Sequence, residues 1–89
     1  MKSQAAIVFG GASGLGEASA RKIADAGHKV TVADLNKEKG QAVAEAIGGS
    51  FIACDVTDED SVKAAVASAA ETDPDGGLRI CVNCAGVGA

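Results

Sequence analysis

A run of glycines near the N-terminus has the residue types that hold an anion. Residues 10–16 read Gly-Gly-Ala-Ser-Gly-Leu-Gly, a G-x-x-x-G-x-G pattern, and they follow the apolar run Ala5–Phe9. Glycine permits a tight turn and lets the backbone come close to a ligand. A helix that starts in such a loop points its unpaired N–H groups at a negative charge. The pattern predicts a diphosphate site, and a loop that only packs a strand against a helix is the alternative.

A carboxylate follows the next β-rich stretch. Asp34 ends the run Lys29–Asp34, which is rich in β-branched residues. An acid at the end of the second strand of a βαβ unit accepts hydrogen bonds from ribose hydroxyls and disfavours a 2′-phosphate. Asp34 therefore favours NAD over NADP. A solvated or helix-capping acid is the competing interpretation.

A second acid follows the third apolar run. Asp55 precedes Val56, and the pair comes directly after the run from Ser50 to Cys54. The Asp55 carboxylate can accept a hydrogen bond from an adenine amino group while the Val56 N–H meets a ring nitrogen. Alternatively, Asp55 only helps to start the following helix. The sequence alone does not decide between the two.

The elements that position these residues alternate between buried strands and amphipathic helices. Strands are predicted at residues 5–9, 29–34, 50–54 and 78–83, and helices at residues 14–26, from the cap Asn36 to Ile47, and from Thr57 or Asp58 onward. Connections this short make the strands parallel and place helices on both faces of the sheet. The sequence predicts an α/β protein, a partial doubly wound Rossmann fold βαβαβαβ with strand order 3-2-1-4. Residues 1–89 form one dinucleotide-binding half-domain in this prediction.

Each predicted helix has a face assigned to the core. The assigned residues are Leu15, Ala18, Ser19, Ile23 and Ala26 in the first helix, Ala42, Val43, Ala46 and Ile47 in the second, and Val62, Ala65, Val66 and Ala69 in the third.

Composition excludes several classes of partner. The net charge is -4 and the acids are scattered, so we expect no surface for nucleic acid or anionic lipid. No apolar run reaches the roughly 18 residues of a membrane span. The first residues lack the layout of a signal peptide, so a cytoplasmic protein is expected. Cys81 and Cys84 form a C-x-x-C, but residues three apart on a strand point to opposite faces, so neither a redox nor a metal site is expected.

The motifs in combination resemble the short-chain dehydrogenase/reductase family of the NAD-preferring type. The glycine loop, Asp34, Asp55-Val56 and the terminal Val-Asn-Cys-Ala-Gly run of residues 82–86 occur in the family's order. The glycine loop and residues 82–86 further resemble the 3-hydroxyacyl-CoA dehydrogenase type-2 branch, which also acts on hydroxysteroids. The resemblance implies coenzyme contacts from Gly10, Ser13, Gly14, Leu15 and Gly16 at the diphosphate, Asp34 at the ribose, Asp55 and Val56 at the adenine, and Cys84, Ala85 and Gly86 along the adenosine. Two positions depart from the family pattern, Phe9 in place of a Thr and Cys84 in place of an Asn.

The resemblance also implies a chemistry, the transfer of a hydride between NAD and a hydroxyl or keto substrate. The family uses a Tyr as general acid/base with a Lys and a Ser, and this sequence contains no Tyr. We therefore expect the 89 residues to stop before the catalytic segment and to be inactive alone. The fourth strand would present an open edge, which predicts self-association or a second chain that completes the sheet.

Two other functions use similar motifs. A non-catalytic dinucleotide-binding module would need no Tyr. An S-adenosylmethionine-dependent methyltransferase also has a glycine-rich turn and an acid after the second strand, but Phe9 and the glycine spacing speak against it.

Overall fold

The computed structural model describes residues 4–10, 14–55, 57–71 and 78–83, which form four strands and three helices. In chain order the elements are β1 (Ala5–Phe9), α1 (Gly14–Asp25), β2 (Lys29–Asp34), α2 (Lys37–Ile47), β3 (Ser50–Ala53), α3 (Glu59–Ala70) and β4 (Leu78–Asn83). The predicted elements are all present. The boundaries differ by one residue at the ends of α1 and β3.

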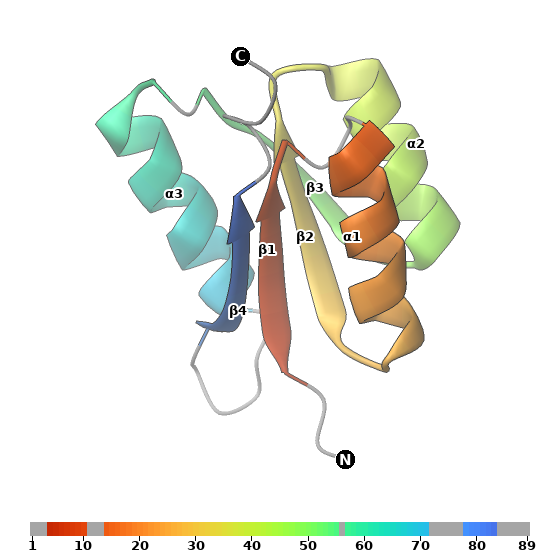
Figure 1. The fold of residues 1–89 in the computed structure, drawn as a ribbon. Coiled ribbons are helices and arrows are strands. Elements are labelled where there is room, and N and C mark those ends of the chain that lie inside the picture. Colours follow the sequence, from red (N-terminus) through yellow and green to blue (C-terminus); the bar gives the residue numbers. More distant parts are fainter. Residues whose placement is uncertain (1–3, 11–13, 56, 72–77, 84–89) are drawn as a thin grey trace.

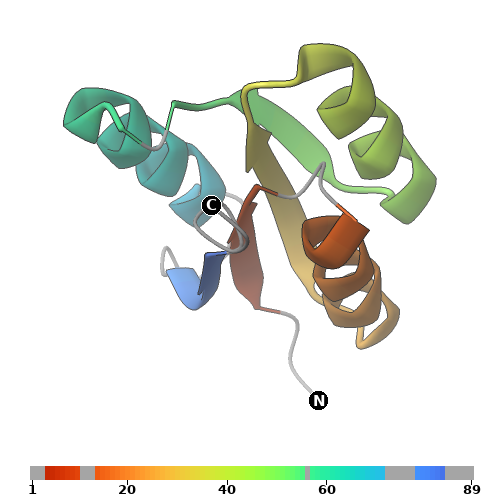
Figure 2. The same ribbon diagram turned by 45° about the horizontal axis from the view of Figure 1, so that its top comes forward.

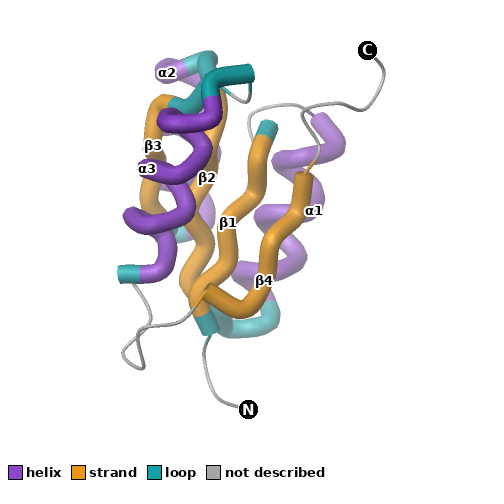
Figure 3. The backbone as a smooth tube through the Cα atoms, turned by 90° about the vertical axis from the view of Figure 1, so that its left-hand side faces the viewer, coloured by secondary structure: helices purple, strands orange, loops and turns teal. Residues whose placement is uncertain are grey.

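The strands form one parallel sheet in the order β3-β2-β1-β4, as the sequence predicted. The helices α1 and α2 cover one face of this sheet and α3 covers the other (Figure 1). The same two layers are visible when the top of the molecule is turned forward (Figure 2). Seen from the side, α3 lies in front of the sheet and α1 lies behind it (Figure 3). The fold is therefore the predicted half of a doubly wound domain.

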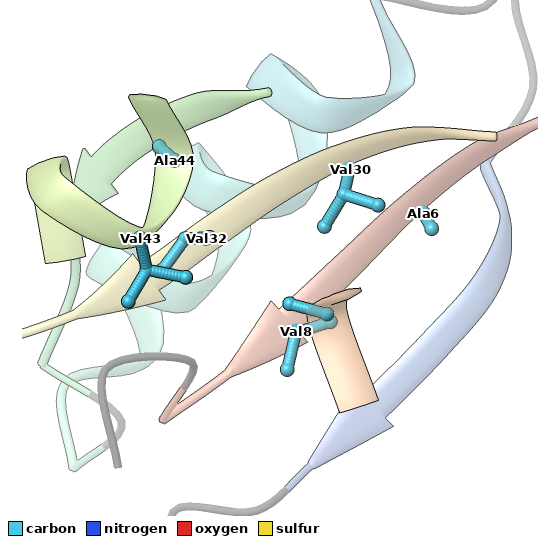
Figure 4. Close-up of a cluster of buried hydrophobic side chains, with 7 residues drawn as sticks. Ala6, Val8, Val30, Val32, Val43 and Ala44 are labelled. Atoms are coloured by element: carbon cyan, nitrogen blue, oxygen red, sulfur yellow. The ribbon is translucent and has the colours of Figure 1, made fainter. Parts of the chain in front are cut away.

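The two faces of β1 and β2 separate two apolar cores. On the side of α1 and α2, a cluster of buried residues combines strand valines with helix alanines (Figure 4). Its members are Ala6, Val8, Ala20, Val30, Val32, Val43 and Ala44. On the side of α3, the buried cluster consists of Ile7, Phe9, Ala33, Cys54, Ala65 and Ala69. Since β1 is buried on both faces, it is apolar throughout, as expected for a central parallel strand.

The helix ends carry the capping interactions that the sequence predicted. The side chain of Asn36 accepts a hydrogen bond from the Lys39 N–H, and the side chain of Asp58 accepts from Asp60 and Ser61. Of the two candidates for the start of α3, Asp58 is the cap. At its other end α2 stops at Gly48, whose φ of 71° is left-handed and suits glycine.

The predicted inner face of α1 is wrong in part. Leu15 is 55% exposed, and Ala18 and Ala26 are exposed as well. The face toward the sheet instead consists of the buried Gly16 and Ala20, with Ile23 and Ala24 packed beside them. These residues follow the helical spacing of three and four. Small residues on this face bring the helix close to the sheet, and a pattern based on large apolar residues does not detect them.

The predicted inner face of α2 is confirmed at Val43, which is buried, and at Ile47, which packs against the core. It is wrong at Ala42 and Ala46, which are exposed, while Gly40 and Ala44 are buried instead. A Cβ atom on Gly40 would collide with the ring of Phe51 from β3, so glycine is needed there for close packing. The predicted stripe of α3 is confirmed, since Ala65 and Ala69 are buried and Val62 and Val66 pack against them.

Candidate functional site

The carboxyl ends of β1, β2 and β3 meet at one edge of the sheet (Figure 1). Backbone hydrogen bonds extend the ladder by one residue at two of these ends. The Gly10 N–H donates to the Ala33 carbonyl at 2.7 Å, and the Cys54 N–H donates to the Asp34 carbonyl at 3.1 Å. The chain segments that carry Gly10, Asp34 and Asp55 are therefore neighbours at this edge. In parallel sheets this is the edge where ligands bind.

The glycine turn places open space beside the first turn of α1. Gly10 has a φ of 75°, which allows the chain to turn sharply out of β1. Gly14 is the first residue of α1 and is exposed, and no described atom lies within 4 Å of the point where a Cβ atom would be. Packing among the described residues therefore gives no reason for glycine at this position. A ligand that approaches the backbone closely would give one.

The next two residues of the run have different surroundings. Leu15 is exposed, and Gly16 is buried on the face of α1 that packs against the sheet. The first N–H groups of α1 have no partner within the helix and carry its partial positive charge. An anion beside Gly14 would meet both the N–H groups and the partial positive charge. This fits the predicted diphosphate contacts of Gly14 and Leu15.

Asp34 is the last residue of β2 and precedes the turn to α2. Its carboxylate oxygen Oδ1 accepts a hydrogen bond from the Asn36 N–H at 2.9 Å, and the Asn36 side chain in turn caps α2. The helix cap is thus Asn36, and Asp34 holds the turn that precedes it. The residue as a whole is half-buried at the end of its strand, beside the turn after β1.

Asp55 is held by two residues that follow it. Its Oδ1 atom accepts hydrogen bonds from the Thr57 hydroxyl at 2.6 Å and from the Thr57 N–H at 2.9 Å. Its own N–H donates to the hydroxyl oxygen of Ser61 at 3.0 Å. The Thr57 hydroxyl, followed by the Thr57 N–H, lowers the pKa of Asp55 below its ordinary value of 3.8. Asp55 therefore takes part in the start of α3, which was one of the two interpretations of this residue.

Several predicted contacts lie outside the described residues. These are Ser13, Val56, Cys84, Ala85 and Gly86. Conversely, sequence reasoning did not identify Thr57 and Ser61 as the partners of Asp55. The spacing of Asp55 and Thr57, an acid followed two residues later by a hydroxyl, is a local turn pattern that could have indicated the first of these contacts.

The described part of the chain contains two cysteines. Cys54 is buried and Cys81 is exposed, and both are free thiols. In this part of the chain, no group of three His, Cys, Asp or Glu side chains is arranged to hold a metal ion. None of the helices there is both long and apolar enough to cross a membrane.

The fold and this edge define a class of protein. An open parallel sheet with a glycine turn after the first strand and an acid after the second is the arrangement of dinucleotide-binding domains. Residues 4–89 match the family model described as short chain dehydrogenase. The chain therefore belongs to the short-chain dehydrogenase family.

Individual relatives agree with this assignment. The chain is 49% identical over 70 residues to (-)-isopiperitenol/(-)-carveol dehydrogenase, mitochondrial, of Mentha piperita, an alignment that covers 74% of this chain and 26% of the relative. It is 44% identical over 88 residues to 3-hydroxyacyl-CoA dehydrogenase type-2 of Drosophila melanogaster, covering 97% of this chain and 34% of the relative.

A solved structure supports the same conclusion. The crystal structure of 3-hydroxyacyl-CoA dehydrogenase type-2 from Mycobacterium avium superposes with a TM-score of 0.81 at 44% sequence identity, covering 90% of this chain and 31% of that chain. The predicted resemblance to the type-2 branch is thereby confirmed. The chain spans about a quarter to a third of the length of the relatives named here. Dehydrogenases of the family depend on a nicotinamide dinucleotide, and oligomerisation is typical among them.

Proposed function

We propose that this chain is the coenzyme-binding portion of an oxidoreductase that transfers a hydride between NAD and a hydroxyl or keto substrate. The observation that carries the proposal is the open space beside Gly14, at the start of α1 and at the carboxyl edge of the sheet. Helix N–H groups and a backbone without a side chain suit a diphosphate. Within the protein as a whole, we propose 3-hydroxyacyl-CoA, which the names of the type-2 relatives give, as one substrate class, and hydroxysteroids, which the family resemblance implied, as another.

The residues at this edge fit a dinucleotide. Gly10, Gly14, Leu15 and Gly16 line the diphosphate in this proposal, together with Ser13. Asp34 lies at the end of the neighbouring strand, where the ribose of the adenosine would follow. NAD itself supplies the hydride acceptor when bound. This chain's own residues bind and orient it.

Asp34 supports NAD rather than NADP. One oxygen of the Asp34 carboxylate accepts a hydrogen bond from the Asn36 N–H, which orients the carboxylate at this edge. A carboxylate in this place accepts hydrogen bonds from the ribose hydroxyls and repels a phosphate. Loss of the hydrogen bonds between the charged Asp34 carboxylate and the ribose would cost about 1.5–3 kcal/mol of binding free energy. This corresponds to a roughly 10- to 150-fold change in coenzyme affinity.

A titration of the 89-residue chain with NADH and NADPH, followed by nicotinamide fluorescence, tests the proposal. We expect NADH to bind more tightly than NADPH, and Asp34→Ala to remove this preference. Asp25→Ala is the matched control, because Asp25 is an exposed acid at the opposite end of α1. The absence of binding by either coenzyme, or equal affinities for both, would contradict the proposal.

A further inference from the structure

Asn36 links the first turn of α2 to the end of β2. Its side-chain oxygen Oδ1 accepts a hydrogen bond from the Lys39 N–H at 3.1 Å, and its carbonyl oxygen accepts one from the Gly40 N–H at 2.9 Å. Its own N–H points the other way along the chain and donates to Oδ1 of Asp34 at 2.9 Å. The helix cap and the acid at the carboxyl edge therefore share one residue.

The turn of α2 that holds Asn36 is anchored to the sheet. Gly40 is buried, and its backbone lies so close to the ring of Phe51 from β3 that a Cβ atom would overlap the ring. Asn36 itself has an extended backbone, with φ of -80° and ψ of 95°, which is usual for a capping residue. Because both its side chain and its carbonyl are bonded to this anchored turn, its N–H is held in one direction, toward Asp34.

The direction of this N–H bears on the choice between the two coenzymes. A carboxylate that a donor has already oriented loses less conformational freedom when ribose hydroxyls bind to it. A carboxylate that rotates more freely can turn its charge away from a 2′-phosphate, which weakens the repulsion of NADP. Both effects of orienting Asp34 favour NAD.

We propose that Asn36 is a positioning residue for coenzyme selectivity: its side chain caps α2, the cap directs the Asn36 N–H, and this N–H orients the Asp34 carboxylate. The inference rests on the proposed function, because it concerns the selectivity of the same site. Asn36 acts through Asp34 and needs no contact of its own with the coenzyme. Coupling between two sites is reciprocal, so a coenzyme that holds the Asp34 carboxylate in place also stabilises the start of α2.

Titration of the 89-residue chain with NADH and NADPH tests the forward direction of this coupling. Asn36→Ala removes the capping oxygen, and we expect the ratio of the two affinities to fall by roughly 2- to 10-fold, the size of one ordinary hydrogen bond. Asn36→Ser keeps an oxygen that can cap the helix and should retain most of the preference. Asp58→Ala is the matched control, because it removes the cap of α3 and should destabilise the fold without changing the ratio.

Amide hydrogen exchange at Lys39 tests the reverse direction. The Lys39 N–H donates to the Asn36 side chain, so its exchange rate reports on the cap. At equal saturation, NADH should slow this exchange more than NADPH does, and the difference should disappear in Asn36→Ala. A residue that only stabilises the helix would give equal protection with both coenzymes.

Failure of the proposed function would be seen in the unmodified chain, as no binding or as equal affinities for NADH and NADPH, and the inference would fail with it. If the unmodified chain prefers NADH and Asn36→Ala keeps that preference, or if Asp58→Ala reduces it as much, the proposed function stands and the inference is overturned. Should Asn36→Ala fail to fold by circular dichroism, Asn36→Gly, which a helix start tolerates better, replaces it and is judged by the same ratio.

Discussion

Replacing Gly14 by alanine separates the role of the glycine turn in binding from its role in folding. Gly14 is the first residue of α1, its φ lies outside the left-handed range, and no described atom lies within 4 Å of the added Cβ position. Alanine is a better helix former than glycine by up to about 1 kcal/mol, and it restricts the unfolded chain. Gly14→Ala should therefore leave the free energy of unfolding unchanged or raise it by less than about 1 kcal/mol, because the first helical turn contributes less than the interior.

The same methyl group should weaken coenzyme binding. It would occupy the open space in which we place the diphosphate, and forcing a methyl group into a filled contact costs about 1–3 kcal/mol. That cost corresponds to a roughly 5- to 150-fold loss of NADH affinity. In Gly14→Ala, the free energy of unfolding would thus stay the same or rise while the affinity for NADH falls.

Urea unfolding followed by circular dichroism and an NADH titration on the same preparations measure the two effects. Gly49→Ala is the contrasting control. A Cβ atom on Gly49 would collide with the backbone carbonyl oxygen of Val30, so this change should lower the free energy of unfolding by about 1–3 kcal/mol. The reasoning would be refuted if Gly14→Ala destabilised the chain as much as Gly49→Ala, or if it left NADH affinity unchanged.

Three further results are expected. The pKa of Asp55 is lowered in the folded chain, so the stability that its carboxylate contributes is complete above the ordinary value of 3.8 and is lost as the pH falls below it. Urea unfolding from about pH 6 to about pH 2 should therefore show a steeper fall in the free energy of unfolding for the unmodified chain than for Asp55→Asn. Parallel curves for the two chains would contradict this. The 89-residue chain should show no alcohol oxidation with NAD in a spectrophotometric assay, and sustained NADH production by a verified preparation would disprove that. Among the described residues, β4 pairs with β1 alone and leaves its other edge open. The chain should therefore self-associate or bind a second chain through this edge. A monodisperse monomer in sedimentation at high concentration would argue against both.

The sheet and its order were predictable because the sequence signals are strong and local. The run Ala5–Phe9 is apolar at every position, and the caps Asn36 and Asp58 are standard helix starts. Strand–helix–strand crossovers with short loops allow only a parallel sheet. The inner face of α1 was not predictable in the same way. Gly16 and Ala20 contribute little hydrophobicity, so the large exposed Leu15 dominated the pattern and shifted the predicted face.

The site was predictable to the extent that its residues follow strand ends. Gly10, Asp34 and Asp55 lie at one edge because parallel strands end there together. The contact between Ser61 and the Asp55 backbone was not predictable, because it depends on how the first turn of α3 is oriented over the end of β3. The hydroxyl of Thr57 likewise has no distinctive signal until the turn is seen.

The location of NADH binding is the most direct test of the central claim. In a ¹⁵N–¹H correlation spectrum recorded during an NADH titration, the largest amide shifts should occur at Gly10, Gly14, Leu15, Asp34 and Asp55, at the carboxyl edge of the sheet. The amides of Lys29 and Ser50, at the amino ends of β2 and β3, should stay in place. Shifts that were absent, or that were concentrated at the amino ends of the strands, would contradict the claim that this chain holds the coenzyme in the way proposed.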